Sequence, residues 1–331
     1  MEPDDVDALV VMSFGGPEAM DEVMPFLRHV TAGRGIPDDR LTAVAEQYRA
    51  FDGVSPLNEY NRELVARLCA QAPDSWLGDR VYLANRNSDP FPADTFRQMR
   101  DAGITRVAAF VTSAFSSYSG CRQYRENLAV GAAAADIEVR VLPKFHDHPL
   151  LADIWADRVA AAAPGTGDRL IFVTHSLPLT QSLGVVPGVT GYLPQHEELG
   201  ARIVERVAAR TGSAPDWTLA FQSRSGPPHQ PWLEPDISAA ITAASEAGVS
   251  RVLVAPIGFC SDNLEIRWDL DTVAAETARE VGVEMVRLEP PQSDARFTDM
   301  IWDLLRRGSG ISCQVACCPN PRTDLPAVGQ A

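Results

Sequence analysis

A histidine and two carboxylates follow closely on two apolar stretches of the sequence. His175 comes directly after residues 170–174, and Glu265 and Asp269 come shortly after residues 251–257. If both stretches are buried parallel strands, these side chains stand at the carboxyl end of a sheet, where open α/β sheets bind ligands. Imidazole and carboxylate groups together can hold a divalent metal or move protons near neutral pH. His175 and Glu265 are therefore candidate catalytic residues and metal ligands, and Asp269 is a further candidate metal ligand.

Each of these side chains also has an ordinary structural interpretation. A lone histidine after a buried strand is commonly a core residue that bonds to the backbone. Glu265 and Asp269 are four residues apart in a predicted helix over 263–281, so both carboxylates lie on one face. An exposed face of this kind would simply be solvated, but like charges on a buried face are costly unless they bind something. Asp262 is suited to cap the start of this helix.

Three cysteines crowd into a short stretch near the end of the chain. Cys313, Cys317 and Cys318 lie within six residues, and Pro319 follows them. A zinc site or an iron-sulfur cluster needs a fourth ligand, and Cys121 at a predicted helix start is the candidate. Four thiolates without histidine suit a 2Fe-2S cluster at least as well as zinc, and disulfides fit a cytoplasmic chain less well.

The composition is that of a globular protein that repels polyanions. The 331 residues suffice for two domains, and no apolar run approaches the roughly 18 residues of a membrane-spanning helix. The acidic start lacks the features of a signal peptide, so we expect a cytoplasmic location. A net charge of −15 disfavours nucleic acid and anionic membranes but allows a local basic site for an anionic ligand. We expect a monomer, because no stripe typical of an interface stands out.

Strands and helices alternate along the chain in the pattern of a doubly wound parallel sheet. We predict strands over residues 7–13, 80–84, 105–112, 137–142, 169–174, 217–222, 251–257 and 284–288. We predict helices over residues 17–29, 38–51, 58–72, 92–102, 121–134, 196–210, 235–247, 263–281 and 293–306. Gly15, Gly16 and Pro17 lack the pattern of a phosphate-binding loop and predict a tight turn with proline at the helix start.

The two halves of the chain resemble each other, which predicts two similar lobes. Phe14 and His175 take equivalent positions, each directly after the first strand of its half. The likeness is carried by residues 9–17 with 170–178 and by residues 106–111 with 251–256. We expect the strand ends of the two lobes to face each other across one active-site cleft.

Prolines interrupt the alternating pattern between the halves and predict the lobe boundary. Pro143, Pro149 and the stretch around Pro164 all fall within residues 143–165. The predicted divisions are a first lobe over 1–150, a second lobe over 151–308 and a cysteine-rich tail over 309–331.

Five motifs spread over the chain form a specific pattern. They are SFGGPE (residues 13–18), GVSPLN (53–58), THSLP (174–178), FQSR (221–224) with Trp232 and Leu233, and residues 258–271. With these motifs the chain resembles the ferrochelatase family over nearly its whole length, and within it the cluster-containing actinobacterial branch that uses coproporphyrin III. The resemblance implies two Rossmann-like lobes with parallel four-stranded sheets, the chelatase fold. It also implies an enzyme of haem biosynthesis that inserts its substrate Fe²⁺ into a porphyrin and releases two protons.

The resemblance implies roles for individual residues as well. His175 and Glu265 match the pair that handles metal and protons, and the four cysteines named above fit members with a 2Fe-2S cluster. The positions that match the porphyrin site are Phe14, Tyr48, Ser55 and Tyr124. Two positions depart from the pattern: Asn263 replaces a histidine of many relatives, and Phe14 replaces a tyrosine of some bacterial members. A second imidazole and a phenolic hydroxyl are therefore absent.

The branch that the chain resembles favours coproporphyrin III as substrate, with protoporphyrin IX as the alternative. Coproporphyrin III is tetra-anionic and needs basic partners, for which Arg34, Arg49 and Arg122 are candidates. Two other classes stay open, namely a chelatase for another metal such as cobalt and a non-catalytic porphyrin or haem carrier. The retained His175 and Glu265 argue against the carrier. The cysteine-rich tail has the further interpretation of a zinc-stabilised interaction module.

Overall fold

The structure is a computed structural model that describes residues 6–72, 80–182, 190–225, 229–308 and 325–328. These residues form two four-stranded parallel sheets, with strand orders β2-β1-β3-β4 and β6-β5-β7-β8. The strands of the first sheet are β1 (Ala8–Ser13), β2 (Val81–Asn85), β3 (Arg106–Val111) and β4 (Glu138–Val141). Those of the second are β5 (Arg169–His175), β6 (Asp216–Gln222), β7 (Arg251–Ala255) and β8 (Glu284–Arg287).

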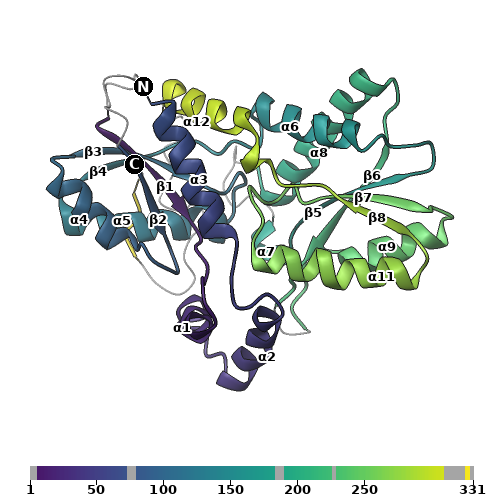
Figure 1. Cartoon of the computed structure of the whole chain (residues 1–331), viewed down its shortest axis with the longest axis horizontal. Helices are drawn as coiled ribbons and strands as arrows, with labels where there is room; N and C mark the ends of the chain where they lie inside the picture. The colour runs from purple at the N-terminus through teal and green to yellow at the C-terminus, as the bar shows by residue number, and fades with distance from the viewer. Residues whose placement is uncertain (1–5, 73–79, 183–189, 226–228, 309–324, 329–331) are drawn as a thin grey trace.

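The strand order is the same in both sheets, so the first half of the chain and the second half fold alike. The central strand β1 corresponds to β5, and the remaining strands follow in the same spatial sequence. Figure 1 shows the two sheets side by side, each with helices on both faces. The prediction of two similar α/β lobes with parallel four-stranded sheets is confirmed.

Alternate residues of the central strands face two different cores, as the pleat of a strand requires. Leu9 and Val11 of β1 join Phe172 of β5 in one large cluster, here called the shared core, which spans both sheets. Helices α3 (Leu57–Ala70), α6 (Pro149–Ala161), α8 (Tyr192–Thr211) and α12 (Ala295–Arg307) cover it. Val10 and Val173 face the outer cores, which are covered by α4 (Pro92–Asp101) and α5 (Gln123–Ala135) or by α9 (Ile237–Glu246) and α11 (Ala275–Glu280).

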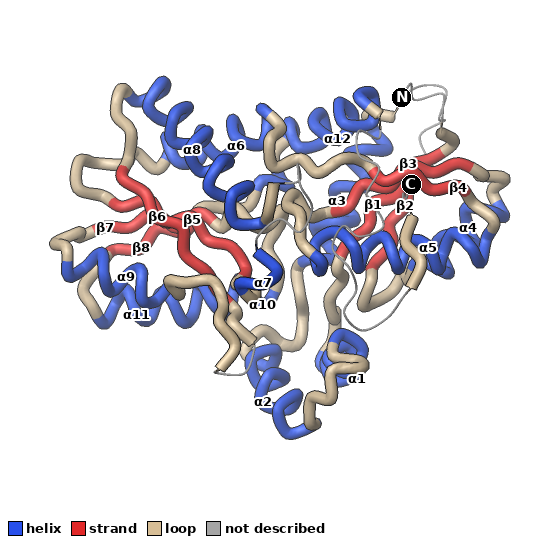
Figure 2. Tube along the Cα trace, turned by 180° about the vertical axis from the view of Figure 1, so that it is seen from behind, coloured by secondary structure: helices blue, strands red, loops and turns tan. Residues whose placement is uncertain are grey.

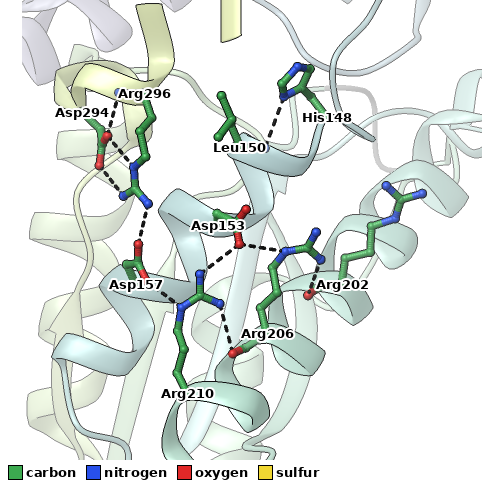
Figure 3. A network of polar contacts seen from close by, with 9 residues as sticks. All are labelled: His148, Leu150, Asp153, Asp157, Arg202, Arg206, Arg210, Asp294 and Arg296. Carbon is green, nitrogen blue, oxygen red and sulfur yellow. Dashed lines mark hydrogen bonds and ion pairs between the residues drawn. The ribbon is translucent and has the colours of Figure 1, made fainter. Parts of the chain in front are cut away.

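Ion pairs connect three of the helices over the shared core (Figure 3). Asp153 of α6 accepts from Arg206 and Arg210 of α8 at 3.0 and 2.9 Å. Asp157, one turn further along α6, accepts from Arg210 at 2.6 Å and from Arg296 of α12 at 2.5 Å. Because α12 also packs against α3, it links the second half of the chain to the first.

Side chains from both lobes meet beyond the carboxyl ends of the strands. Ser116, which follows β3, donates its backbone N–H to Oε1 of Gln195 on α8 at 2.7 Å. Cys260, which follows β7, directs its Sγ to the carbonyl oxygen of Thr112 at 3.5 Å. The strand ends of the two sheets therefore face each other, as the repeat predicted.

A helical pair is inserted between β1 and α3. It comprises α1 (Met20–Val30) and α2 (Asp38–Arg49), and in Figures 1 and 2 it projects from between the two sheets. The pair has a small core of its own, formed by Val23, Phe26, Leu27, Leu41 and Ala45. Its position places α2 near both lobes.

The structure departs from the sequence predictions at several helices. Helix α1 begins at Met20, not at Pro17, after an extended Ala19. Helix α6 was not predicted, because Pro149 was taken as a break, whereas it occupies the first position of the helix, where proline needs no N–H partner. Two π-helices, η3 (Tyr118–Arg122) and η4 (Arg267–Ala274), were also not predicted. No helix in the described ranges is both long and apolar enough to cross a membrane.

Candidate functional site

The carboxyl end of β5 presents an imidazole to a carboxylate from the segment after β7. His175 is the last residue of β5, and its Nε2 lies 3.2 Å from Oε1 of Glu265. Its Nδ1 lies 2.6 Å from the carbonyl oxygen of Ser176 and therefore carries a proton. The Ser176 carbonyl holds the imidazole at Nδ1, and the Glu265 carboxylate holds it at Nε2. Nε2 is therefore the nitrogen that faces the site.

A short α-helical turn followed by a π-helix carries both candidate carboxylates. Glu265 lies in α10 (Leu264–Ile266), and Asp269 lies in η4 directly after it. Asn263 caps the turn, because its side-chain oxygen accepts from the N–H of Ile266 at 2.8 Å. π-helical segments are rare and concentrate at functional sites.

The predicted cap residue of this segment has a different partner. Asp262 is buried, and its two carboxylate oxygens accept from Arg287 of β8 at 2.8 and 3.0 Å. The prediction that Asp262 caps the helix is therefore wrong, because the bidentate guanidinium takes both of its oxygens. Asn263 caps the turn in its place.

The two partners of the His175–Glu265 pair shift each other's pKa. Desolvation alone would lower the pKa of His175, but the Glu265 carboxylate and the Ser176 carbonyl outweigh it and raise the pKa to about 9. Desolvation raises the pKa of Glu265, but the positive charge of His175 brings it below its ordinary value. At neutral pH the pair is therefore an imidazolium facing a carboxylate.

Asp269 is held by two neighbours at the end of β6. Gln222 donates its amide Nε2 to Oδ2 of Asp269 at 3.2 Å, and the Ser223 hydroxyl donates to the same oxygen. Burial raises the pKa of Asp269 to about 6; the Ser223 hydrogen bond opposes this shift and the charge of Glu265 adds to it. Ser223 has a φ of 59°, a left-handed conformation uncommon for a residue other than glycine. The FQSR motif marked these residues in the sequence, but their contact with Asp269 was not predicted.

A series of contacting aromatic side chains in the first lobe extends toward the His175–Glu265 pair. Phe14, at the end of β1, packs edge-on against Phe26 of α1, with ring centroids 6.3 Å apart. Phe26 in turn lies 6.2 Å from Tyr48 of α2. Burial raises the pKa of Tyr48, and the charge of Glu265 raises it further, so Tyr48 lies within electrostatic reach of Glu265. Phe14 itself is 37% exposed.

Ser55 and Tyr124, the other two residues predicted to line a porphyrin site, are buried in the first lobe. Ser55 is buried against Gly16, where a Cβ would come within 2.6 Å of the Ser55 Cβ. Tyr124 of α5 lies beneath the guanidinium of Arg86, which also lies over the ring of Phe14. Phe14, Tyr48 and Tyr124 are thus joined by a chain of contacts through Phe26 and Arg86, whereas Ser55 contacts Gly16.

The arginines suggested as anion partners have other surroundings. Arg122 is largely buried, with its Nε 2.9 Å from Glu126 and its Nη2 donating to the carbonyl of Leu325. Arg49 pairs with Glu46 at 3.1 Å on the exposed surface of α2. Arg34 lies in the exposed turn after α1.

The candidate cluster cysteines are described only in part. Cys121 lies in η3, three residues before Tyr124. Cys313, Cys317 and Cys318 lie outside the described residues. Within the described ranges, no three His, Cys, Asp or Glu side chains are arranged to hold a metal ion.

A comparison with solved structures defines the class of fold. The chain is similar to the sirohydrochlorin chelatase SirB from Bacillus subtilis subspecies spizizenii, solved in complex with cobalt, at a TM-score of 0.52 and 9% identity. The match covers 91% of this chain and 94% of that one. The two lobes therefore have the chelatase fold.

Sequence comparison gives the family. The ferrochelatase family model matches residues 6–309, and the chain belongs to the ferrochelatase family. It is 43% identical to the coproporphyrin III ferrochelatase of Frankia alni, over 96% of this chain and 87% of that protein. It is 40% identical to the coproporphyrin III ferrochelatase of Streptomyces griseus, over 100% of this chain and 97% of that protein.

Proposed function

We propose that this protein inserts Fe²⁺ into coproporphyrin III in haem biosynthesis, with His175 and Glu265 as the catalytic pair. The observation that carries the proposal is the 3.2 Å contact between His175 and Glu265 at the strand end that faces the first lobe. Membership of the ferrochelatase family supports the reaction, and the relatives named coproporphyrin III ferrochelatase support the substrate. The porphyrin would lie between the pair and the aromatic residues Phe14 and Tyr48.

The protonation state of the pair suggests an order of events. Insertion forms four bonds from iron to pyrrole nitrogens and breaks two N–H bonds, so two protons must leave. His175 is protonated in the substrate-free protein and cannot accept a proton or bind iron in that state. An arriving dication disfavours the imidazolium, and the proton passes to solvent or to Asp269, whose pKa is near 6. The neutral Nε2 then accepts one pyrrole proton and releases it to solvent, and it takes up and releases the second in the same way, while Glu265 stabilises the charge that results each time.

The test is anaerobic metallation followed by visible absorption. The purified protein is incubated with Fe²⁺ and either coproporphyrin III or protoporphyrin IX. We expect the free-porphyrin bands to disappear with coproporphyrin III, and His175→Ala to abolish this while His229→Ala, an exposed histidine, leaves it unchanged. Binding without metallation above background would contradict the enzyme and favour a porphyrin carrier. A faster reaction with protoporphyrin IX would contradict the proposed substrate.

We propose in addition that Cys121, Cys313, Cys317 and Cys318 hold a 2Fe-2S cluster. Support comes from the last described segment of the chain. Leu325 follows Cys318 by seven residues, a span of at most about 25 Å, and its carbonyl accepts from Arg122 at 3.0 Å. The three thiols of the tail are therefore within reach of Cys121, the neighbour of Arg122. Thiolate sulfur is the ligand that such clusters use, and a bound cluster would supply electron-transfer capacity and a covalent link to the tail.

The cluster proposal is tested by colour and metal content. We expect purified protein to absorb in the visible range and to contain iron, and Cys317→Ser to lose both. The matched control is Cys69→Ser on α3, which should keep them. Colourless protein that contains zinc would contradict the cluster and favour a zinc-stabilised tail.

We also propose that the protein is a cytoplasmic monomer. The bacterial relatives of the haem-synthesis family support the location. Light scattering of the purified protein tests the monomer, and a mass of twice 35.9 kDa would contradict it.

A further inference from the structure

We propose that Arg86, together with Tyr124, binds a propionate carboxylate of the porphyrin and favours coproporphyrin III over protoporphyrin IX. This inference rests on the proposed function and adds a residue that selects the substrate. Arg86 is half-buried and directly follows β2. Its backbone N–H donates to the carbonyl of Ser13 at 2.9 Å, which fixes it beside Phe14 at the carboxyl edge of the sheet.

Two aromatic rings and one amide hold the Arg86 guanidinium in place. Its central carbon lies 4.6 Å from the ring centroid of Tyr124 and 5.5 Å from that of Phe14. Its Nε donates to Oδ1 of Asn127 at 3.0 Å. Cation–π contacts on two rings limit the freedom of the side chain, so less conformational entropy is lost when it binds an anion. The guanidinium also donates toward the Tyr124 hydroxyl, and its remaining N–H donors can pair with a carboxylate.

The charge of Arg86 is not matched by an acidic side chain in the part of the chain that the structure describes. None of the ion pairs among those residues includes Arg86, although the sequence has 44 acidic against 29 basic residues. Arg122, which the sequence suggested as an anion partner, is by contrast paired with Glu126. A fixed cation without a carboxylate, beside an exposed phenylalanine of the proposed porphyrin site, is suited to a carboxylate from the ligand.

Tyr124 completes the proposed carboxylate site. Burial raises the pKa of its hydroxyl, an effect that the charge of Arg86 opposes, so the group stays protonated and can donate a hydrogen bond. Coproporphyrin III carries four propionates, and protoporphyrin IX carries vinyl groups in two of these places. A ring whose face rests on Phe14 would bring a propionate at its edge toward Arg86, whose guanidinium lies 5.5 Å from the Phe14 ring centroid. A vinyl group there would leave the guanidinium unpaired, which is the origin of the selectivity.

Each lobe therefore carries the charge that attracts one of the two substrates. Glu265 and Asp269 of the second lobe attract the metal cation, whereas Arg86 of the first lobe attracts the anionic edge of the porphyrin.

The experiment measures kcat and KM for both porphyrins in Arg86→Met, which keeps the side-chain stem on the rings but removes the charge. The control is Arg97→Met on α4, an exposed arginine paired with Asp94, which changes the net charge equally. We expect KM for coproporphyrin III to rise about tenfold in Arg86→Met, with kcat little changed, and to stay as in wild type in Arg97→Met. KM for protoporphyrin IX should change less, and Arg86→Lys should recover part of the affinity.

Several results would overturn the inference. Equal KM values for coproporphyrin III in Arg86→Met and Arg97→Met would remove Arg86 from the site. Equal losses for both porphyrins would remove the selectivity. If the wild-type protein metallates neither porphyrin, the proposed function fails, and fluorescence titration with metal-free coproporphyrin III still tests whether Arg86→Met weakens binding.

Discussion

The charge state of one histidine determines what the site can do before substrate arrives. His175 has a pKa of about 9, raised by Glu265 above the value near 6.5 of an unfolded chain. A raised pKa means that the protonated pair stabilises the fold fully below about pH 6.5, and that this contribution is lost as pH rises through about 9. The pair is thus most stable in the form that is inactive as a base. In the proposed mechanism, His175 must lose this proton before it can accept one from a pyrrole nitrogen.

Removing the carboxylate should lower the pKa of His175. In Glu265→Gln the negative charge is gone while the desolvation remains, so we expect the titration midpoint of His175 to fall from about 9. NMR titration of labelled histidines in the substrate-free protein measures the midpoint. His196, buried with a pKa of about 3, is an internal control that should not titrate between pH 5 and 10. An unchanged midpoint near 9 would show that Glu265 is not the cause.

At the scale of elements, the site depends on how closely β5 and the segment after β7 approach. A Cβ on Gly258 would lie 2.0 Å from Oγ1 of Thr174 and 2.8 Å from its Cα. Thr174 in turn bonds to the hydroxyl of Tyr192 at 2.6 Å, and Tyr192 donates to the carbonyl of His175 at 3.1 Å. Glycine at this position therefore determines where the end of β5 that carries His175 lies.

Gly258→Ala should destabilise the protein and disturb the pair. Because the new methyl group meets backbone atoms, we expect the free energy of unfolding to fall by about 1–3 kcal/mol and metallation to slow. Chemical denaturation measures the first effect. Gly165→Ala is the control, because its Cβ would meet no atom closer than 3.6 Å. Equal stability of the two variants would contradict the close approach.

Sequence patterns predicted the elements better than the contacts between them. The eight strands and the repeat were visible because buried strands are apolar and end in polar residues such as His175. The π-helix that carries Asp269 was not, since its extra residue per turn depends on packing rather than on local preference. The setting of Arg86 was missed for a similar reason, because the two aromatic residues that it contacts, Phe14 and Tyr124, are far apart in the sequence. The pairing of His175 with Glu265 was anticipated. The raised pKa of His175 could be inferred only once the distance between the two side chains was known.

On the scale of the whole molecule, the lobes are joined by a continuous apolar core and by a few buried polar contacts. Gln195 of α8 is 3% exposed; it accepts from the N–H of Ser116 and donates to the Ser116 hydroxyl at 3.1 Å. Its amide also donates to the carbonyl of Thr190 at 2.8 Å. This side chain therefore fixes the loop that leads to η3 against the second lobe.

Gln195→Leu should weaken this junction. The substitution keeps a similar side-chain volume but leaves the N–H of the half-buried Ser116 without its acceptor, so we expect the free energy of unfolding to fall by about 1–3 kcal/mol. Denaturant titration measures the change. Gln98→Leu on α4, an exposed position, is the control and should stay within about 0.5 kcal/mol of wild type. A similar small change in both variants would show that the contact contributes little.

The repeated strand order has a consequence for a flat ligand. Phe14 and His175 occupy the same place in the two copies of the fold, yet one offers an apolar ring and the other an ionisable one. A planar macrocycle between them would meet a different kind of side chain on each face, although the lobes that enclose it are alike. Insertion would then have a direction: the metal enters and the protons leave on the side of His175, while the side of Phe14 supports the ring.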